Sequence, residues 1–135
     1  MRKILALLCL CVLMVITFCA CEYTSNKKYS EDDLEAIKLK YEKYLDETYP
    51  GENFTVKVWQ EYTENTGGTG LPDYKGNVIR HIITDSKGNR FRIIQDGSKL
   101  FDDYKKVLDG DVYYNEKGQH VHYDDDGNVL FEDYY

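Results

Sequence analysis

Beyond residue 21 the sequence has no cysteine. All four cysteines of the 135-residue chain, Cys9, Cys11, Cys19 and Cys21, lie within or at the edge of its N-terminal apolar segment. The remainder therefore excludes a disulfide framework, a cysteine-based zinc site and a thiol nucleophile. A folded domain in this part of the chain has to be stabilised by its core and its polar contacts.

The first twenty residues also lack any aspartate or glutamate, whereas all 24 acidic residues follow them. Arg2 and Lys3 are two of the 17 basic residues, which leaves 15 basic against 24 acidic residues and a formal charge of −9. Binding to nucleic-acid phosphates or to anionic lipid headgroups requires clustered Lys and Arg. The charge therefore argues against a nucleic-acid partner and against electrostatic docking on a membrane.

The N-terminus has the pattern of an export signal. Arg2 and Lys3 precede the apolar run Ile4–Phe18, as in the positive and apolar regions of a signal peptide. The run ends in Phe18-Cys19-Ala20-Cys21, which resembles the lipobox of bacterial lipoproteins, although Phe18 replaces the usual Leu and Cys19 is uncommon at its position. The resemblance implies a lipidated Cys21, carrying diacylglycerol and palmitate, on the outer side of the cell membrane. A signal anchor over residues 4–21 or an ordinary cleaved signal peptide are the alternatives.

These boundaries divide the chain into three parts. Residues 1–20 are predicted to be a lipoprotein signal peptide, residues 21–29 a lipidated tether, and residues 30–135 a single extracytoplasmic domain. The length suits one domain of ordinary size.

A helix is predicted to begin after Ser30 and to end before Pro50-Gly51. Ser30 and Asp33 form a capping-box-like pair, and acidic residues in the first turn suit the helix dipole. Apolar residues recur at three- and four-residue spacing on one side of this helix: Leu34, Ile37, Tyr41, Tyr44 and Leu45.

Strands are predicted over residues 54–62, 78–84 and 90–95, with a long loop over residues 63–77 and a turn over residues 86–89. A second short helix is expected over residues 99–108, and three strands near residues 112–114, 120–123 and 129–131 are expected to form a meander.

Four Gly-containing tripeptides precede strand residues, and tight hairpins explain them better than a repeat architecture. They are Lys75-Gly76-Asn77, Lys87-Gly88-Asn89, Lys117-Gly118-Gln119 and Asp126-Gly127-Asn128.

The predicted fold is therefore α+β, with an N-terminal amphipathic helix packed on an antiparallel sheet, a second short helix and a C-terminal β meander. By architecture alone it is similar to cystatin-like helix-on-sheet domains and to small uncharacterised lipoproteins of Gram-positive bacteria. An architecture does not specify a function.

One segment has the spacing of a metal site. His120, His122 and Asp124 alternate along a predicted strand, so their side chains are expected on one face, where two imidazoles and a carboxylate could hold zinc or iron. Exposed histidines on an outer strand face are the simpler interpretation, and no cofactor is expected. The acidic run Asp124–Asp126 before Gly127 suits an acidic hairpin turn better than a calcium loop, because the helix–loop–helix calcium pattern fails at its first ligand.

No pattern typical of an enzyme is present: the sequence has no Gly-x-Ser-x-Gly and no phosphate-binding glycine loop.

The only tryptophan, Trp59, lies on the same strand face as Lys57 and Glu61 rather than with the core residues. It is expected either to be covered by a second layer, such as the C-terminal meander, or to face a partner.

The sequence thus predicts a non-enzymatic, membrane-anchored lipoprotein that binds a protein or an envelope component. A sharper version is an immunity protein against an extracellular toxin. The alternative, from another class, is a metal-binding lipoprotein or metal-dependent enzyme that uses His120, His122 and Asp124.

Overall fold

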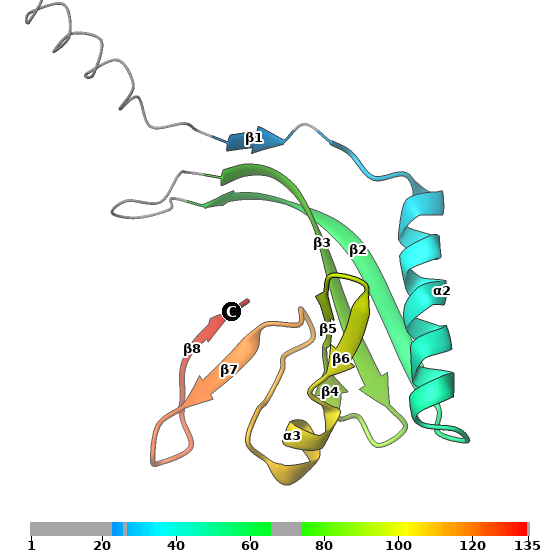
Figure 1. Ribbon diagram of the computed structural model, residues 1–135. Coiled ribbons are helices and arrows are strands. Elements are labelled where there is room, and N and C mark those ends of the chain that lie inside the picture. The colour runs from blue at the N-terminus through cyan, green and yellow to red at the C-terminus, as the bar shows by residue number, and fades with distance from the viewer. Residues whose placement is uncertain (1–22, 26, 66–73, 135) are drawn as a thin grey trace, which may run out of the picture. The chain divides into compact units, whose positions relative to one another are not determined.

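The computed structural model describes residues 23–25, 27–65 and 74–134 (Figure 1). These residues fall into two units. The smaller holds β1 (Tyr23–Ser25), the end of β2 (Phe54–Asn65) and the start of β3 (Tyr74–Asp85). The larger spans Lys28–Glu61 and Val78–Tyr135 and contains every other element.

In the smaller unit, β1 pairs with β3 in parallel, with Tyr23 opposite Tyr74 and Ser25 opposite Gly76. The loop predicted over residues 63–77 is therefore shorter than expected, because strand structure extends to Asn65 and resumes at Tyr74. Its centre, with the glycine-rich stretch, lies outside the described residues.

The N-terminal helix of the larger unit is confirmed as α2 (Glu31–Thr48). Ser30 caps it with a complete capping box: its hydroxyl accepts from the backbone N–H of Asp33 at 3.1 Å, and the Asp33 carboxylate accepts from the N–H of Ser30 at 2.9 Å. The side chain of Gln60 in β2 bonds both backbone groups of Tyr29, at 3.0 Å each. The start of the helix is thereby fixed to the sheet.

The sheet that receives α2 has the order β1-β3-β2, and β4 (Arg90–Phe91) pairs with the end of β3 across the turn after Asp85. The predicted return strand over residues 90–95 is broken after Phe91. Its second part, β5 (Ile93–Asp96), pairs instead with β6 (Lys99–Asp102). Residues 99–102 are therefore strand rather than helix, and the second helix, α3, spans only Tyr104–Asp109.

The core lies between α2 and one face of β2 and β3. Its buried members are Tyr41, Leu45, Val56, Ile83, Phe91 and Ile93. The alternation expected for β2 is confirmed at Phe54, Val56 and Val58, which contribute to this core. The aromatic rings of Phe54, Phe91 and Tyr104 pack in pairs with centroids 4.5–5.5 Å apart.

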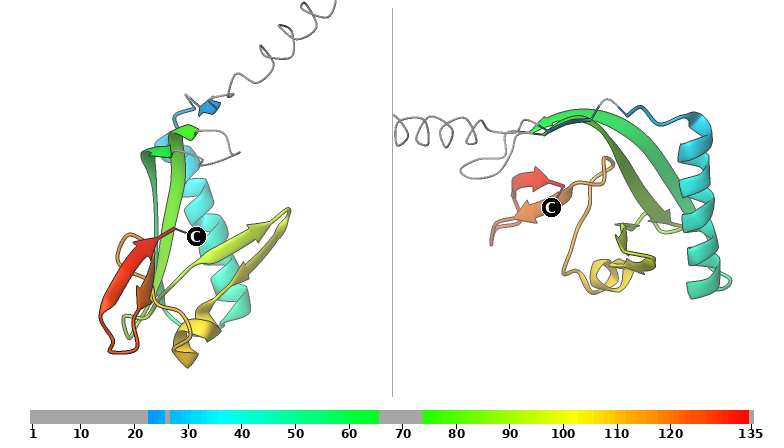
Figure 2. Two further views of the ribbon diagram at one scale, coloured as in Figure 1. Left: turned by 90° about the vertical axis from the view of Figure 1, so that its left-hand side faces the viewer. Right: turned by 45° about the horizontal axis from the view of Figure 1, so that its top comes forward.

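The opposite face of the sheet meets the C-terminal part of the chain (Figure 2). There β7 (His120–Tyr123) pairs antiparallel with β8 (Val129–Asp133), and Tyr114 adds only an isolated bridge to His120. The third strand of the predicted meander is thus a single bridging residue. The overall class is α+β: a helix on an antiparallel sheet, a short second helix and paired C-terminal strands.

Among the described residues, no helix combines the length and the apolar character that a membrane crossing requires.

Candidate functional site

Trp59 lies on the face of β2 that points away from α2. Its side chain is half-buried and lines a cleft of about 410 Å³ together with Lys57 and Glu61 from the same strand face. The opposite side of the cleft comes from Glu116, Lys117 and Tyr134, which lie more than fifty residues away in the sequence. The C-terminal segment therefore covers this face in part, and Trp59 is neither a core residue nor fully open to solvent.

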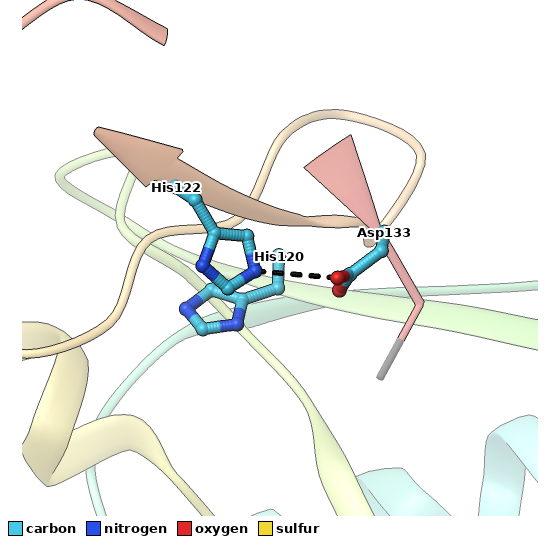
Figure 3. Close-up of side chains that lie close together, drawn as sticks. All are labelled: His120, His122 and Asp133. Carbon is cyan, nitrogen blue, oxygen red and sulfur yellow. Dashed lines mark ion pairs between the residues drawn. The ribbon is translucent and has the colours of Figure 1, made fainter. Parts of the chain in front are cut away.

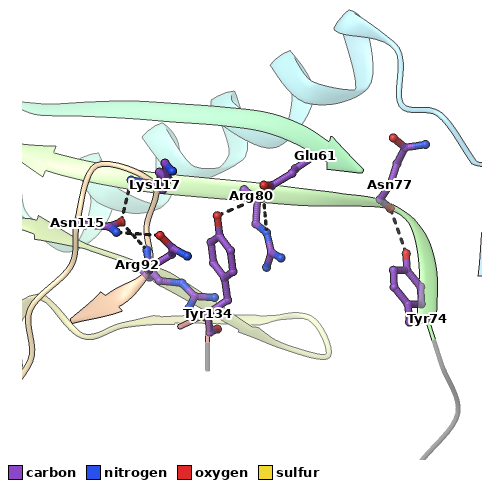
Figure 4. A network of polar contacts seen from close by, with 9 residues as sticks. Glu61, Tyr74, Asn77, Arg80, Arg92, Asn115, Lys117 and Tyr134 are labelled. Atoms are coloured by element: carbon purple, nitrogen blue, oxygen red, sulfur yellow. Dashed lines mark hydrogen bonds and ion pairs between the residues drawn. The ribbon is translucent and has the colours of Figure 1, made fainter. Parts of the chain in front are cut away.

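Polar contacts hold two lining residues of this cleft, Glu61 and Tyr134, in place (Figure 4). The carboxylate of Glu61 accepts from Arg80 Nε at 3.3 Å and from the Tyr134 hydroxyl at 3.2 Å. The guanidinium carbon of Arg80 lies 3.5 Å from the centroid of the Tyr134 ring, within the range of a cation–π contact. Burial and the Glu61 charge raise the pKa of Tyr134, so its hydroxyl stays a hydrogen-bond donor at neutral pH.

The rim is fixed by the turn from Asn115 to Gln119. Asn115 Oδ1 accepts from the backbone N–H groups of Lys117 and Gln119, at 2.9 and 3.0 Å, and Glu116 pairs with Arg90 at 3.1 Å. This turn also lies close to β3, as the buried Gly118 shows. A Cβ atom there would sit 2.8 Å from the carbonyl oxygen of His81.

The same turn occurs three times, which the sequence interpretation recognised only as glycine hairpins. In each five-residue turn, the side-chain oxygen of the first residue, Asp or Asn, accepts hydrogen bonds from the backbone N–H groups two and four residues later. The fourth residue is a Gly with positive φ. The turns are Asp85–Asn89, Asn115–Gln119 and Asp124–Asn128. The hairpin interpretation is thus confirmed for three of the four tripeptides, whereas Gly76 lies inside β3. The pattern Asp/Asn-x-x-Gly-Asn/Gln was readable in the sequence.

These contacts give Asp124 a structural role. Its carboxylate accepts from the N–H groups of Asp126 and Asn128, at 3.0 and 2.7 Å, and from the Asn128 amide. The hydrogen bonds from Asn128, more than any other cause, lower the pKa of Asp124. Asp124 is not in the histidine cluster that the structure forms, so the predicted set of three is only partly brought together.

The cluster consists of His120, His122 and Asp133 (Figure 3). Within the described residues it is the one group whose His, Cys or acidic side chains are close enough to share a metal ion, with ligand atoms within 4.8 Å of one another. Asp133 enters because it lies opposite His120 in the β7–β8 pair. The acidic member of the cluster is therefore Asp133 rather than the predicted Asp124. The pairing of β7 with β8 decides this, and the pattern of a single strand does not contain it.

Four tyrosine hydroxyls donate to three aspartates at the base of the larger unit, a feature that the sequence analysis missed. Tyr44 and Tyr49 donate to Asp102 at 2.6 and 2.8 Å, Tyr104 donates to Asp85 at 2.9 Å, and Tyr114 donates to Asp103. Asp85 and Asp103 are buried. Burial and the hydrogen bonds raise the pKa values of Tyr44 and Tyr104 to about 12. These contacts stabilise the fold around α3 and involve no free reactive group.

An exposed apolar surface lies on β8, at the edge of the β7–β8 pair. Val129, Leu130 and Phe131 are consecutive and each more than half exposed. Consecutive apolar residues on an edge strand are a potential site for contact with another chain. This surface is the second candidate for partner binding.

No family model matches the chain, and neither a curated protein nor a solved structure matches it.

Proposed function

We propose that the protein is an extracytoplasmic lipoprotein, anchored through Cys21, that binds a protein partner at the cleft beside Trp59. Cys21 lies outside the described residues, so the proposal of an anchor rests on the leader and on the sequence Phe18-Cys19-Ala20-Cys21. The proposal of a binding surface rests on the geometry of the cleft.

The observation that carries this proposal is the position of Trp59 in a cleft whose walls are already fixed. Tryptophan and tyrosine are enriched among residues that dominate binding energy, especially where a rim of other residues excludes water. Here Trp59 and Tyr134 line one cleft, and contacts among Arg80, Glu61 and Tyr134 hold the lining residues Glu61 and Tyr134 in place. A preformed cleft loses little conformational freedom on binding, which favours affinity.

The charge of the chain indicates the partner's chemistry. The cleft carries lysine and glutamate side chains on both sides, so it suits a polar segment with charges of both signs. The chain after the leader carries a formal charge of −9, which favours rapid association with a basic protein. A basic toxin from a neighbouring cell is such a partner, and capturing it at the membrane would make this protein an immunity protein.

Site-specific photo-crosslinking in the producing cells tests the binding surface. A photoreactive amino acid replaces Lys57 at the cleft, or Lys43 on the exposed side of α2 as a matched control. We expect one discrete protein adduct from position 57, none from position 43, and loss of the adduct in Trp59→Ala. We expect this loss because truncating an aromatic anchor to alanine costs about 2 kcal/mol or more of binding free energy.

Two results would overturn the cleft as the binding surface. One is the absence of any adduct from position 57 under conditions in which the protein is folded and abundant. The other is an adduct from position 130 on β8 that survives Trp59→Ala, because it would assign binding to the exposed apolar strand.

Metabolic labelling with a clickable fatty acid tests the anchor. The wild-type chain should incorporate the label, and Cys21→Ala should lose it and accumulate as the unprocessed precursor. Cys19→Ala is the matched control, since the lipobox assigns the acyl chains to Cys21 alone. Normal labelling and processing of Cys21→Ala would contradict the lipoprotein proposal.

A further inference from the structure

We propose that His120, His122 and Asp133 form a binding site for one Zn²⁺ ion that links β7 to β8. The proposal is independent of the partner-binding cleft and of the lipid anchor. It differs from the sequence prediction in its third ligand, because Asp133 takes the place of Asp124, and it replaces the expectation that no cofactor is bound.

The two strands place the three ligands at one point. His120 and His122 are two residues apart on β7 and therefore share a face of the strand, with ring centroids 4.1 Å apart. Asp133 lies directly opposite His120 on β8. Figure 3 shows the carboxylate of Asp133 directed toward the His122 ring, with the His120 ring alongside.

The spacing of the ligand atoms suits a tetrahedral ion. Zinc binds histidine nitrogen and carboxylate oxygen at about 2.0–2.1 Å, so two ligand atoms in a tetrahedral site lie about 3.3 Å apart. His122 Nε2 and Asp133 Oδ2 are 3.4 Å apart, which is already this spacing. All three ligand atoms lie within 4.8 Å, so the remaining adjustment is roughly 1.5 Å at most to reach the zinc spacing.

The state of His122 points to a ligand. Its Nε2 atom is buried and makes no hydrogen bond, although the Asp133 carboxylate is near. Two rings hold the His122 ring in place: the centroids of His120 and Phe131 each lie 4.1 Å from its centroid, and Phe131 stacks on it with an interplanar angle of 20°. A fixed imidazole with an unbonded nitrogen beside a carboxylate is an arrangement that a metal ion completes.

The donor types select the ion. Two imidazole nitrogens and one carboxylate oxygen suit Zn²⁺, whereas Ca²⁺ and Mg²⁺ prefer sites made of oxygen alone. Three protein ligands leave a fourth tetrahedral position for water or for a donor from a partner. Because the ligands come from both strands, bound zinc would stabilise the β7–β8 pair against separation. Since the ion would bind the folded state and not the unfolded chain, it would also raise the stability of the fold.

Calorimetric titration of the full chain with Zn²⁺, in detergent at pH 7.5, tests the site. We expect the wild-type chain to bind one ion and the His122→Ala variant to bind none. In Asp133→Asn the Kd should increase by more than about tenfold, because the ion then loses one of three protein ligands. Asp124→Asn is the matched control: it removes an acidic charge nearby in sequence but no ligand, so its Kd should equal the wild-type value. Titration with Mg²⁺ should give no binding at this site.

A variant that keeps the ligand number separates coordination from folding. Asp133→His supplies a third imidazole and should retain zinc binding, whereas Asp133→Leu should lose it. Circular dichroism of each variant without metal should match the wild type. Absence of zinc binding to the wild-type chain would overturn the proposal. So would wild-type affinity in His120→Ala or in His122→Ala, or an affinity that depends on Asp124 instead of Asp133.

Discussion

The two faces of the β2–β3 sheet are stabilised in different ways. The face toward α2 buries apolar side chains such as Val56 and Ile83 in one continuous core. The opposite face carries Trp59, Glu61 and Arg80, and segments from the C-terminal part of the chain reach it through hydrogen bonds and a cation–π contact. On that side Ile82 of β3 is almost completely buried.

The helix-facing side is suited to stabilising the fold, whereas the opposite side is suited to recognising a partner. Apolar burial is non-directional and contributes in proportion to area, so the helix-facing side supplies most of the folding free energy. Polar contacts contribute less to stability, but their geometry is specific. The second face is therefore suited to holding a shaped cleft, and disrupting it should cost less stability than disrupting the core.

The largest effect is expected for Phe91→Ala. Phe91 has no exposed surface and contacts the rings of Phe54 and Tyr104. Its truncation should lower the free energy of unfolding by about 3–5 kcal/mol, measured by urea denaturation. Leu130→Ala, at a residue that is 61% exposed, is the control and should change stability by less than about 0.5 kcal/mol. Equal losses in the two variants would contradict the location of the core.

An intermediate effect is expected where the second face meets the turn at Gly118. This residue has φ of 71°, and a Cβ would lie 2.8 Å from the backbone oxygen of His81. Gly118→Ala should therefore cost about 2–4 kcal/mol, the sum of a left-handed backbone and a close contact. Gly127→Ala has a similar φ of 82° with nothing within 4 Å, so about 1–2 kcal/mol is expected. If the two variants unfold at the same urea concentration, the turn does not approach β3.

The smallest effect, at most about 1.4 kcal/mol for each pH unit, concerns His81, a polar residue of β3 whose ring contacts Tyr41 of α2. Its Nε2 lies 2.8 Å from the oxygen and 3.2 Å from the nitrogen of Ile93. Burial, followed by the Arg92 charge, lowers the pKa of His81 to about 4. Because the folded pKa is below the unfolded value near 6.5, the neutral ring stabilises the fold above pH 6.5.

This stabilisation should be lost as the pH falls from 6.5 toward 4, by at most about 1.4 kcal/mol per pH unit from this one proton. Urea denaturation at pH 7, 6, 5 and 4.5 measures it. His81→Gln keeps a hydrogen-bonding side chain without the titrating ring, and its stability should fall less steeply over this range. Parallel slopes for His81→Gln and the wild type would show that His81 does not titrate with an altered pKa.

Local patterns determined much of the fold. The capping box at Ser30, the three- and four-residue spacing around Tyr41 and the alternation around Val56 predicted α2 and β2 correctly, because each depends on neighbours within a few residues. The prediction was wrong for residues 99–102. Apolar residues such as Leu100 and Phe101 also fit a helical face, and pairing with β5 decided the strand instead.

The candidate sites depended on which strands meet. The sequence by itself determined that Trp59, Lys57 and Glu61 share one strand face and that His120 and His122 share another. Only the tertiary structure placed Tyr134 and the turn at Lys117 across from Trp59, and Asp133 in place of Asp124 beside the histidines. The physical reason is that side-chain periodicity follows from backbone geometry along a single strand, whereas the residue opposite is set by register between segments, which many local sequences permit equally well.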